Sequence, residues 1–158
     1  MGSSQTPSSQ FRGHLPCHDT INTHNWPVDR GSGTRLTDLH GVGALVAARI
    51  MGEVDDIRRF ESKAKFAAAN GTAPVPASSG RTQRHRLRRG GNRKLNRALY
   101  IAAITQARAD HHGRDNLLRR QREGKSHREA LRCLKRRISD TVYRTLITDA
   151  TQTVHGTT

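Results

Sequence analysis

The sequence predicts a small all-helical domain, and three of its features favour this class. In the C-terminal third, apolar residues recur at spacings of three and four, which places them on one face of a helix. A run of small, helix-favouring residues follows the turn Gly41-Val42-Gly43. Outside a proline-rich loop and a basic run, no segment alternates apolar and polar residues as a half-buried strand does. Helices therefore account for the expected core.

The chain divides by composition into four segments. Residues 1–33 are rich in Ser, Thr, Gly, Pro and His without a helical period, so we expect a disordered leader. Residues 34–122 are expected to form the folded domain. A long amphipathic helix over 123–150 and a short tail over 151–158 complete the prediction.

Two short helices are expected in the first half of the domain. The first covers 44–51, and Gly52 is expected to end it. The second covers 63–69, because Ser62 is a good N-cap and Asn70-Gly71 is a good stop signal. The Pro/Ser/Gly-rich segment 71–80 that follows is predicted to be a loop.

Two longer helices are expected in the second half. Asn92 is placed to cap the first, and Gly113 is expected to break it. Its predicted buried face comprises Leu95, Leu99, Ala102 and Gln106. The second begins with Ser126-His127-Arg128-Glu129, a capping box in which the hydroxyl and the carboxylate each accept a backbone N–H. Its predicted buried face comprises Leu131, Leu134, Ile138, Val142 and Leu146.

The composition points to a polyanionic partner. The chain has 28 Lys and Arg against 13 Asp and Glu, a net charge of +15, whereas solubility alone needs only modest net charge. Only 33% of residues are hydrophobic and 4% aromatic, so the core is thin. No apolar stretch approaches a membrane span, and no carboxylate pair has metal-site spacing. We expect no membrane association and a cytoplasmic, nucleoid-associated bacterial protein.

Two motifs could bind phosphate. Gly41 and Gly43 flank a turn before a helix, which resembles a helix-hairpin-helix unit with free N–H groups at a helix N-terminus. A plain tight turn explains the same glycines equally well. The second motif is a basic run without any acid, which favours DNA binding over a solvated face. Its candidate DNA-binding residues are Arg81, Arg84, Arg86, Arg88, Arg89, Asn92, Arg93, Lys94 and Arg97.

Ser78-Ser79-Gly80 directly precedes this run. A serine beside arginines could attack a phosphodiester, although the same residues are typical of a polar turn. Residues 36–120 resemble the C-terminal transposase domain of the insertion sequence 110, 116 and 902 family. The resemblance is carried by four blocks in the family's order: 39–43, 53–60, 71–80 and 89–99.

The resemblance implies a DNA transposase or recombinase whose nucleophile is Ser79, with Ser78 as the alternative. In this family a separate N-terminal nuclease-like domain supplies an Asp-Glu-Asp-Asp tetrad for a divalent ion, and some members use a structured guide RNA. Residues 1–33 do not resemble that domain. We therefore expect a truncated copy that is inactive alone, holds no cofactor, and needs Mg²⁺ only with the missing domain. A homo-oligomer is compatible with these features.

Two other hypotheses remain open. The chain could be a non-catalytic, helix-hairpin-helix-like module that binds DNA or structured RNA, for which Ser79 is dispensable. It could also be a fragment that does not fold stably, given its thin core.

Overall fold

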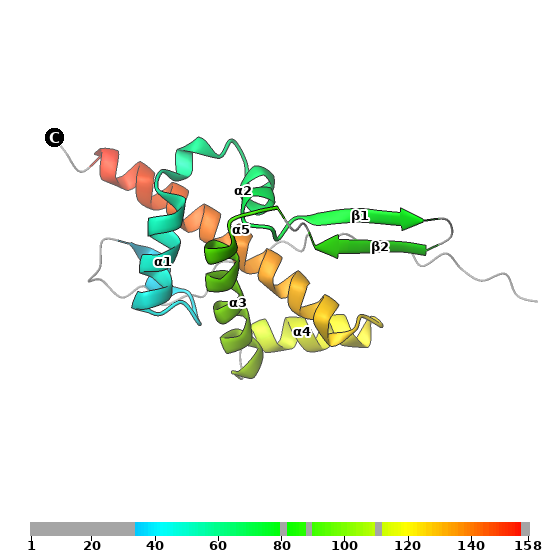
Figure 1. Ribbon diagram of the computed structural model, residues 1–158. Helices are drawn as coiled ribbons and strands as arrows, with labels where there is room; N and C mark the ends of the chain where they lie inside the picture. The colour runs from blue at the N-terminus through cyan, green and yellow to red at the C-terminus, as the bar shows by residue number, and fades with distance from the viewer. Residues whose placement is uncertain (1–33, 80–81, 88–89, 110–111, 156–158) are drawn as a thin grey trace, which may run out of the picture.

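The computed structural model describes residues 34–79, 82–87, 90–109 and 112–155, and within 75–79, 82–87 and 153–155 it describes only the backbone. The helical class is confirmed, with one β-hairpin added to the helices (Figure 1). The elements are η1 (Arg35–Asp38), α1 (Ala44–Val54), η2 (Ile57–Arg59), α2 (Lys63–Ala69), β1 (Pro74–Ser79), β2 (Thr82–Leu87), α3 (Arg93–Arg108), α4 (His112–Arg122) and α5 (His127–His155).

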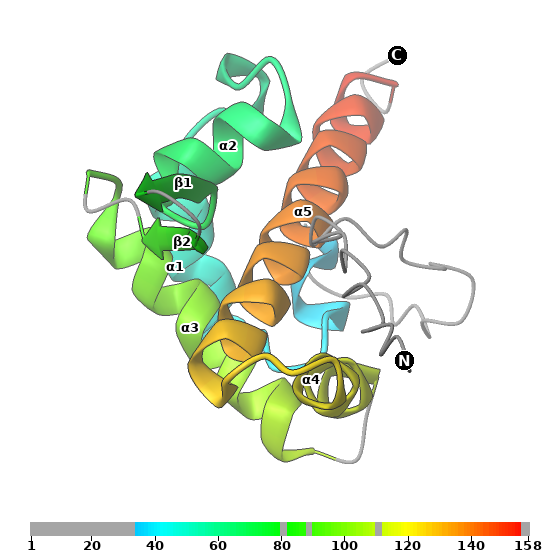
Figure 2. The ribbon, with the colours of Figure 1, turned by 90° about the vertical axis from the view of Figure 1, so that its right-hand side faces the viewer.

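Helix α5 is the central element of the core. It packs against η1, η2, α2, α3 and α4, and Figure 2 shows α3 and α4 beside it. The predicted apolar face is buried, with Leu131 only partly so, and it meets Phe66 and Leu99 from other helices. The helix ends at His155, a turn beyond the predicted boundary. Because so many elements meet on α5, the thin core is concentrated along one helix.

The predicted helix caps are confirmed. The Ser62 hydroxyl accepts a hydrogen bond from Lys65 N, and the Asn92 side chain accepts from two N–H groups in the first turn of α3. In the capping box, Ser126 N donates to the Glu129 carboxylate at 3.0 Å and Glu129 N donates to Ser126 Oγ at 3.4 Å. These local signals fix where three of the helices begin.

The predicted loop over 71–80 is wrong, because β1 and β2 form an antiparallel hairpin there. Pro74 and Pro76 lie in β1 without disrupting it. A two-stranded sheet has only edge strands, so a proline can lack its N–H on the unpaired side. The basic run likewise supplies β2 rather than an irregular segment.

Two glycines do not end helices as expected. Helix α1 continues through Gly52 to Val54 and is capped by Asp55, which has a φ of 58°. Gly113 lies inside α4, where an added Cβ would stand 2.6 Å from Gln106 Cβ. The absence of a side chain at Gly113 thus allows α4 to cross close to α3.

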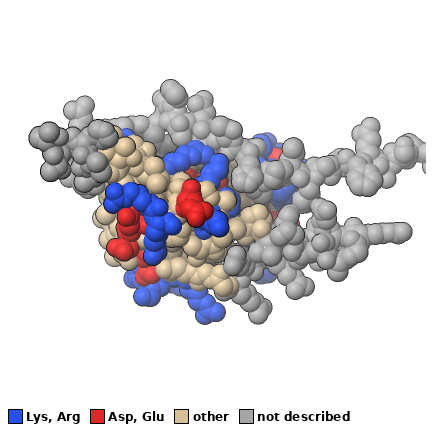
Figure 3. Space-filling model, turned by 90° about the horizontal axis from the view of Figure 1, so that it is seen from above, with Lys and Arg blue, Asp and Glu red and all other residues tan. Residues whose placement is uncertain are grey.

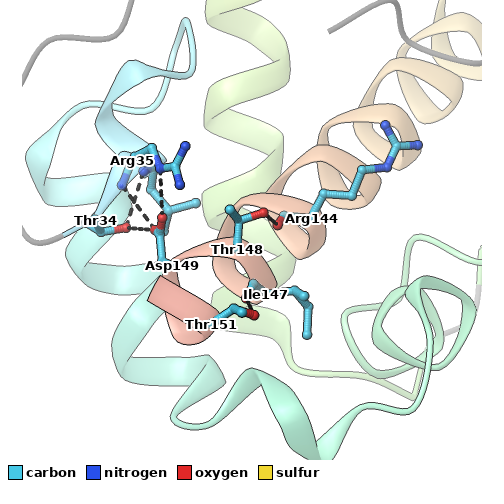
Figure 4. A network of polar contacts seen from close by, with 8 residues as sticks. Thr34, Arg35, Arg144, Ile147, Thr148, Asp149 and Thr151 are labelled. Carbon is cyan, nitrogen blue, oxygen red and sulfur yellow. Dashed lines mark hydrogen bonds and ion pairs between the residues drawn. The ribbon is translucent and has the colours of Figure 1, made fainter. Parts of the chain in front are cut away.

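The start of the domain is tied to the far end of α5 (Figure 4). The Asp149 carboxylate accepts hydrogen bonds from Thr34 Oγ1 at 3.0 Å and from Arg35 N at 3.1 Å. It also pairs with Arg35 Nε at 3.3 Å. These contacts join residues more than 100 positions apart and fix η1 against α5.

Candidate nucleic-acid interface

The hairpin places the candidate serines on a projecting element. Figure 1 shows β1 and β2 extending away from the helices. Ser79 pairs with Thr82 at the far end of the hairpin, and Ser78 pairs with Gln83. Residues 80–81 join the strands and lie outside the described residues. Ser78 and Ser79 therefore lie at the far end of β1, away from the core.

The basic run is divided between the hairpin and α3. Arg84 pairs with Ala77 and Arg86 with Val75, so both belong to the hairpin that carries the serines. The remaining described members are Arg93, Lys94 and Arg97, which are exposed on the first turns of α3. They follow the base of the hairpin in the chain. At about 3.4 Å per residue, a six-residue strand separates the base of the hairpin from its tip by about 17 Å. Candidates Arg81, Arg88 and Arg89 lie outside the described residues.

A buried polar network holds the base of the hairpin. Asn70 is fully buried, and its Nδ2 donates to Ser139 Oγ of α5 at 2.7 Å. Its Oδ1 accepts from Thr72 N at 3.1 Å and Thr72 Oγ1 at 2.7 Å. Its carbonyl accepts from Asn96 Nδ2 of α3 at 2.6 Å. Since buried polar groups are costly when unpaired, this network fixes where the hairpin leaves the body.

The segment that follows β2 packs closely on the segment that precedes β1. A Cβ at Gly91 would stand 3.0 Å from both Ala69 O and Gly71 N. The neighbouring Asn92 N donates to the same Ala69 carbonyl at 2.8 Å. Because residue 91 is a glycine, the backbones of these two segments can lie in direct contact.

Asn92 is engaged within the protein. Its Oδ1 accepts from Lys94 N and Leu95 N at 3.0 Å each, and its Nδ2 donates to Glu53 Oε2 at 2.8 Å. Lys94 Nζ also pairs with Glu53 at 3.4 Å. The hydrogen bond from Asn92, followed by the charge of Lys94, lowers the pKa of Glu53 below its ordinary value despite partial desolvation. Glu53 therefore joins the end of α1 to the start of α3.

The two glycines of the first motif have different surroundings. Gly41 has a φ of +81°, and an added Cβ would stand 2.8 Å from Ala102 O. Next to it, the His40 carbonyl accepts from Gln106 Nε2 at 2.7 Å. Gly43 faces open space and caps α1 without a side-chain hydrogen bond. Gly41 thus serves helix packing, whereas the N-terminus of α1 beside Gly43 is exposed.

The surface around η2 and α2 has mixed charge. Figure 3 shows Lys and Arg groups beside Asp and Glu groups on the face seen from above. On η2, Arg58 Nε pairs with Asp56 at 3.0 Å, and both side chains are about half or more exposed. Mixed charge of this kind is typical of a solvated surface, in contrast to the acid-free basic run.

The described parts of the chain offer neither a metal cluster nor a membrane span. No three His, Cys, Asp or Glu side chains gather there closely enough to hold an ion. No helix in these ranges has both the length and the apolar character needed to cross a bilayer.

Several residues that shape this region make long-range contacts that the sequence does not predict. Glu53, Asn70 and Lys135 meet residues 39 or more positions away. Each contact depends on how the helices pack, so spacing along the chain does not reveal it.

The chain is similar to proteins of mobile DNA elements. Residues 33–117 match the family model described as Transposase IS116/IS110/IS902 family. A 43.6 kDa protein of insertion element IS110 from Streptomyces coelicolor is 39% identical over 107 residues, covering 66% of this chain and 26% of the relative.

Two further relatives are also proteins of insertion elements. A 42 kDa protein of insertion element IS900 from Mycobacterium paratuberculosis is 34% identical over 65% of this chain and 26% of its own length. A 44.8 kDa protein of insertion element IS116 from Streptomyces clavuligerus is 32% identical over 68% of this chain and 27% of its own length. The chain thus matches about a quarter of each relative.

Proposed function

Because the chain belongs to the IS116/IS110/IS902 transposase family, we propose that it is a DNA-binding domain that acts in DNA recombination. The observation that carries this proposal is the hairpin, which joins Ser79 to Arg84 and Arg86 through one antiparallel register. A projecting two-stranded ribbon can reach into a DNA groove while its cations neutralise phosphates. Arg93 and Arg97, exposed at the hairpin base, extend the positive surface onto α3.

Ser79 is the proposed nucleophile and Ser78 the alternative. The Ser79 Oγ would attack phosphorus, forming a Ser–O–P bond while the bond to the leaving deoxyribose oxygen breaks. The hydroxyl proton would pass to a base, and the leaving oxygen would take up a proton from an acid or water. Arginine side chains stabilise negative charge on a phosphoryl group at such a centre. The hairpin extends away from the helices, so it could bring this serine to a DNA strand.

A divalent ion such as Mg²⁺, held by another domain, would stabilise charge on the phosphoryl oxygens. This chain would contribute the serine and the positive surface and would be inactive without that domain. The proposed further partners are a structured guide RNA and a second copy of the chain. Binding to DNA would also keep the protein with the nucleoid.

The alternative is a non-catalytic module of helix-hairpin-helix type. The exposed N-terminus of α1 beside Gly43 favours it, since free N–H groups there could donate hydrogen bonds to a phosphate. In this alternative Ser79 has no chemical role.

Binding can be tested by charge-matched double variants. Arg84→Gln with Arg86→Gln should weaken binding to a 30-base-pair duplex by about tenfold or more, because two phosphate contacts are lost. Arg58→Gln with Arg59→Gln removes the same charge from η2 and should have less than about a threefold effect. Equal losses in the two double variants would exclude the hairpin as the binding element.

Chemistry can be tested by trapping a protein–DNA adduct on a denaturing gel. The chain alone with Mg²⁺ and donor DNA should give no adduct. Addition of the metal-binding domain of a full-length relative should produce one that is lost in Ser79→Ala and kept in Ser78→Ala. An adduct that survives in Ser79→Ala would remove this residue from the nucleophile role.

A further inference from the structure

Lys135 is a buried lysine without an acidic partner. Its side chain lies between α5 and α3 with only 7% of the residue exposed. Nζ donates to Asn96 Oδ1 at 2.8 Å and stands 6.0 Å from the centre of the Tyr100 ring. No described carboxylate lies within ion-pair distance of it. Burying an ammonium group without an opposite charge is costly, so a structural role alone does not explain this lysine.

The surroundings of Lys135 are positive. Desolvation, followed by the charge of Arg132, lowers the pKa of Lys135 below its ordinary value. Arg128, Arg132 and Lys135 follow one another along α5 at spacings of four and three, which puts them on one face. Of the acids that flank Lys135 on this helix, Asp140 is paired with Arg136, and Glu129 is held by hydrogen bonds to Ser126.

Helix α3 presents a matching stripe. Arg93, Arg97 and Tyr100 have the same spacings of four and three, and all three are exposed. Asn96 lies on the same side, where it joins Lys135 to the hairpin base through Asn70. Figure 2 shows α3 and α5 side by side over this region. The two stripes form a basic seam, composed of Arg93, Arg97, Tyr100, Arg128, Arg132 and Lys135.

Tyr100 gives the seam an aromatic surface. The residue is 44% exposed, although most aromatic side chains in a thin core are needed for packing. An exposed ring beside cations is the arrangement with which proteins bind unpaired bases, because the ring stacks on the base while the cations neutralise the phosphate. A duplex offers no free base face for such a contact.

We propose that the basic seam between α3 and α5 binds single-stranded DNA, with a backbone phosphate at Lys135 and Arg132 and a neighbouring unpaired base stacked on Tyr100. The inference rests on the proposed function only in requiring that the chain handles DNA. The hairpin would hold duplex DNA, and the seam would take a strand released from it. Asn96 and Asn70 connect the two surfaces.

The test uses the full chain and fluorescence anisotropy with a labelled thymidine 20-mer and a duplex of equal length. Lys135→Met should weaken binding to the single strand by about fivefold and reduce the salt slope by about 0.7, as for one lost phosphate contact. Lys65→Met removes the same charge from an exposed site on α2 and should change binding by less than about twofold. The melting temperature of Lys135→Met should equal or exceed that of the parent chain.

Tyr100→Leu is a second variant at an exposed position, so folding does not obscure its result. It should weaken single-strand binding by about fivefold or more and leave duplex binding unchanged, because one stacking contact is lost. Equal effects of Lys135→Met and Lys65→Met, or an unchanged single-strand affinity in Tyr100→Leu, would overturn the proposal. Tighter binding to an RNA 20-mer, weakened by both variants, would also contradict the assignment to DNA.

The proposal for the hairpin and the proposal for the basic seam can be refuted independently of each other. Loss of duplex binding in the Arg84→Gln, Arg86→Gln variant with normal behaviour of Lys135→Met would refute the seam alone. The opposite pattern would refute the hairpin and leave the seam supported.

Discussion

Buried cations in two parts of the molecule differ in their partners. At the end of α4, Arg120 reaches Glu123 at 2.9 Å, and within α5 Arg136 reaches Asp140 at 3.0 Å. In the seam between α3 and α5, Lys135 is about as deeply buried but meets an amide. Arg120 and Arg136 are therefore each neutralised by a carboxylate of the protein itself, whereas the charge of Lys135 is left for a ligand to neutralise. The presence of an acidic partner, more than the depth of burial, therefore distinguishes a cation that stabilises the fold from a cation that is available to bind a ligand.

The largest effect is expected where a buried ion pair is broken. Arg136→Ala leaves the Asp140 carboxylate, only 9% exposed, without its partner and should lower the free energy of unfolding by about 3–5 kcal/mol. Urea denaturation measures this loss. Arg119→Ala removes an exposed partner of Glu123 and should cost less than about 1 kcal/mol. Similar losses in the two variants would contradict a structural role specific to the buried pair.

The next largest effect concerns the two glycines of the first turn. Gly41→Ala should destabilise by about 2 kcal/mol or more, since a left-handed backbone costs about 1–2 kcal/mol and the Cβ overlaps Ala102 O. Gly43→Ala has open space and should cost well under about 1 kcal/mol. Thermal melts compare them. A loss of DNA affinity in folded Gly43→Ala would support phosphate binding at α1, and equal melting of both variants would refute the packing role of Gly41.

A smaller loss of stability is expected at Asn92. Its substitution distinguishes a helix-capping role from a role in DNA binding. Asn92→Ala removes the acceptor for Lys94 N and Leu95 N and should lower stability by about 1 kcal/mol. DNA affinity at a temperature where the variant is folded should change by less than about twofold. A large affinity loss without destabilisation would instead support the predicted role of Asn92 as a DNA-binding residue.

The smallest effect is a pH dependence at the capping box. Hydrogen bonds from the Ser126 side chain and backbone lower the pKa of Glu129 below 4.5. A carboxylate with a lowered folded-state pKa contributes stability above 4.5 that is lost as pH falls through the folded value. Ser126→Ala should therefore be less stable than the parent at pH 7, with the difference shrinking below pH 4.5. A difference independent of pH would contradict this linkage.

Sequence patterns predicted the helices and their caps because these signals are local. Ser62, Asn92 and Ser126 each bond to backbone groups within three residues, and the buried faces of α3 and α5 follow a simple spacing. Gly113 was misread because its small size serves contact with Gln106 of another helix, not a change of backbone direction. The hairpin was missed because two prolines argue against a strand unless both strands are edges.

The candidate site was only partly accessible to sequence reasoning. Arg84, Arg93 and Arg97 were found because cations without acids are visible along the chain. Their division between a hairpin and a helix depends on how the chain folds back, and so does the place of Lys135 beside Asn96. Contacts between residues distant in sequence have no periodic signature, so the seam emerged only from the packing of α3 on α5.

The salt dependence of DNA binding tests the central claim most directly, namely that the cations of the hairpin and α3 bind the nucleic-acid backbone. With about six phosphates contacted, a plot of log K against log salt for duplex DNA should have a slope near about −5. A slope near about −1 would mean that these cations form only a solvated surface, and it would contradict both the hairpin interface and the proposed recombination function.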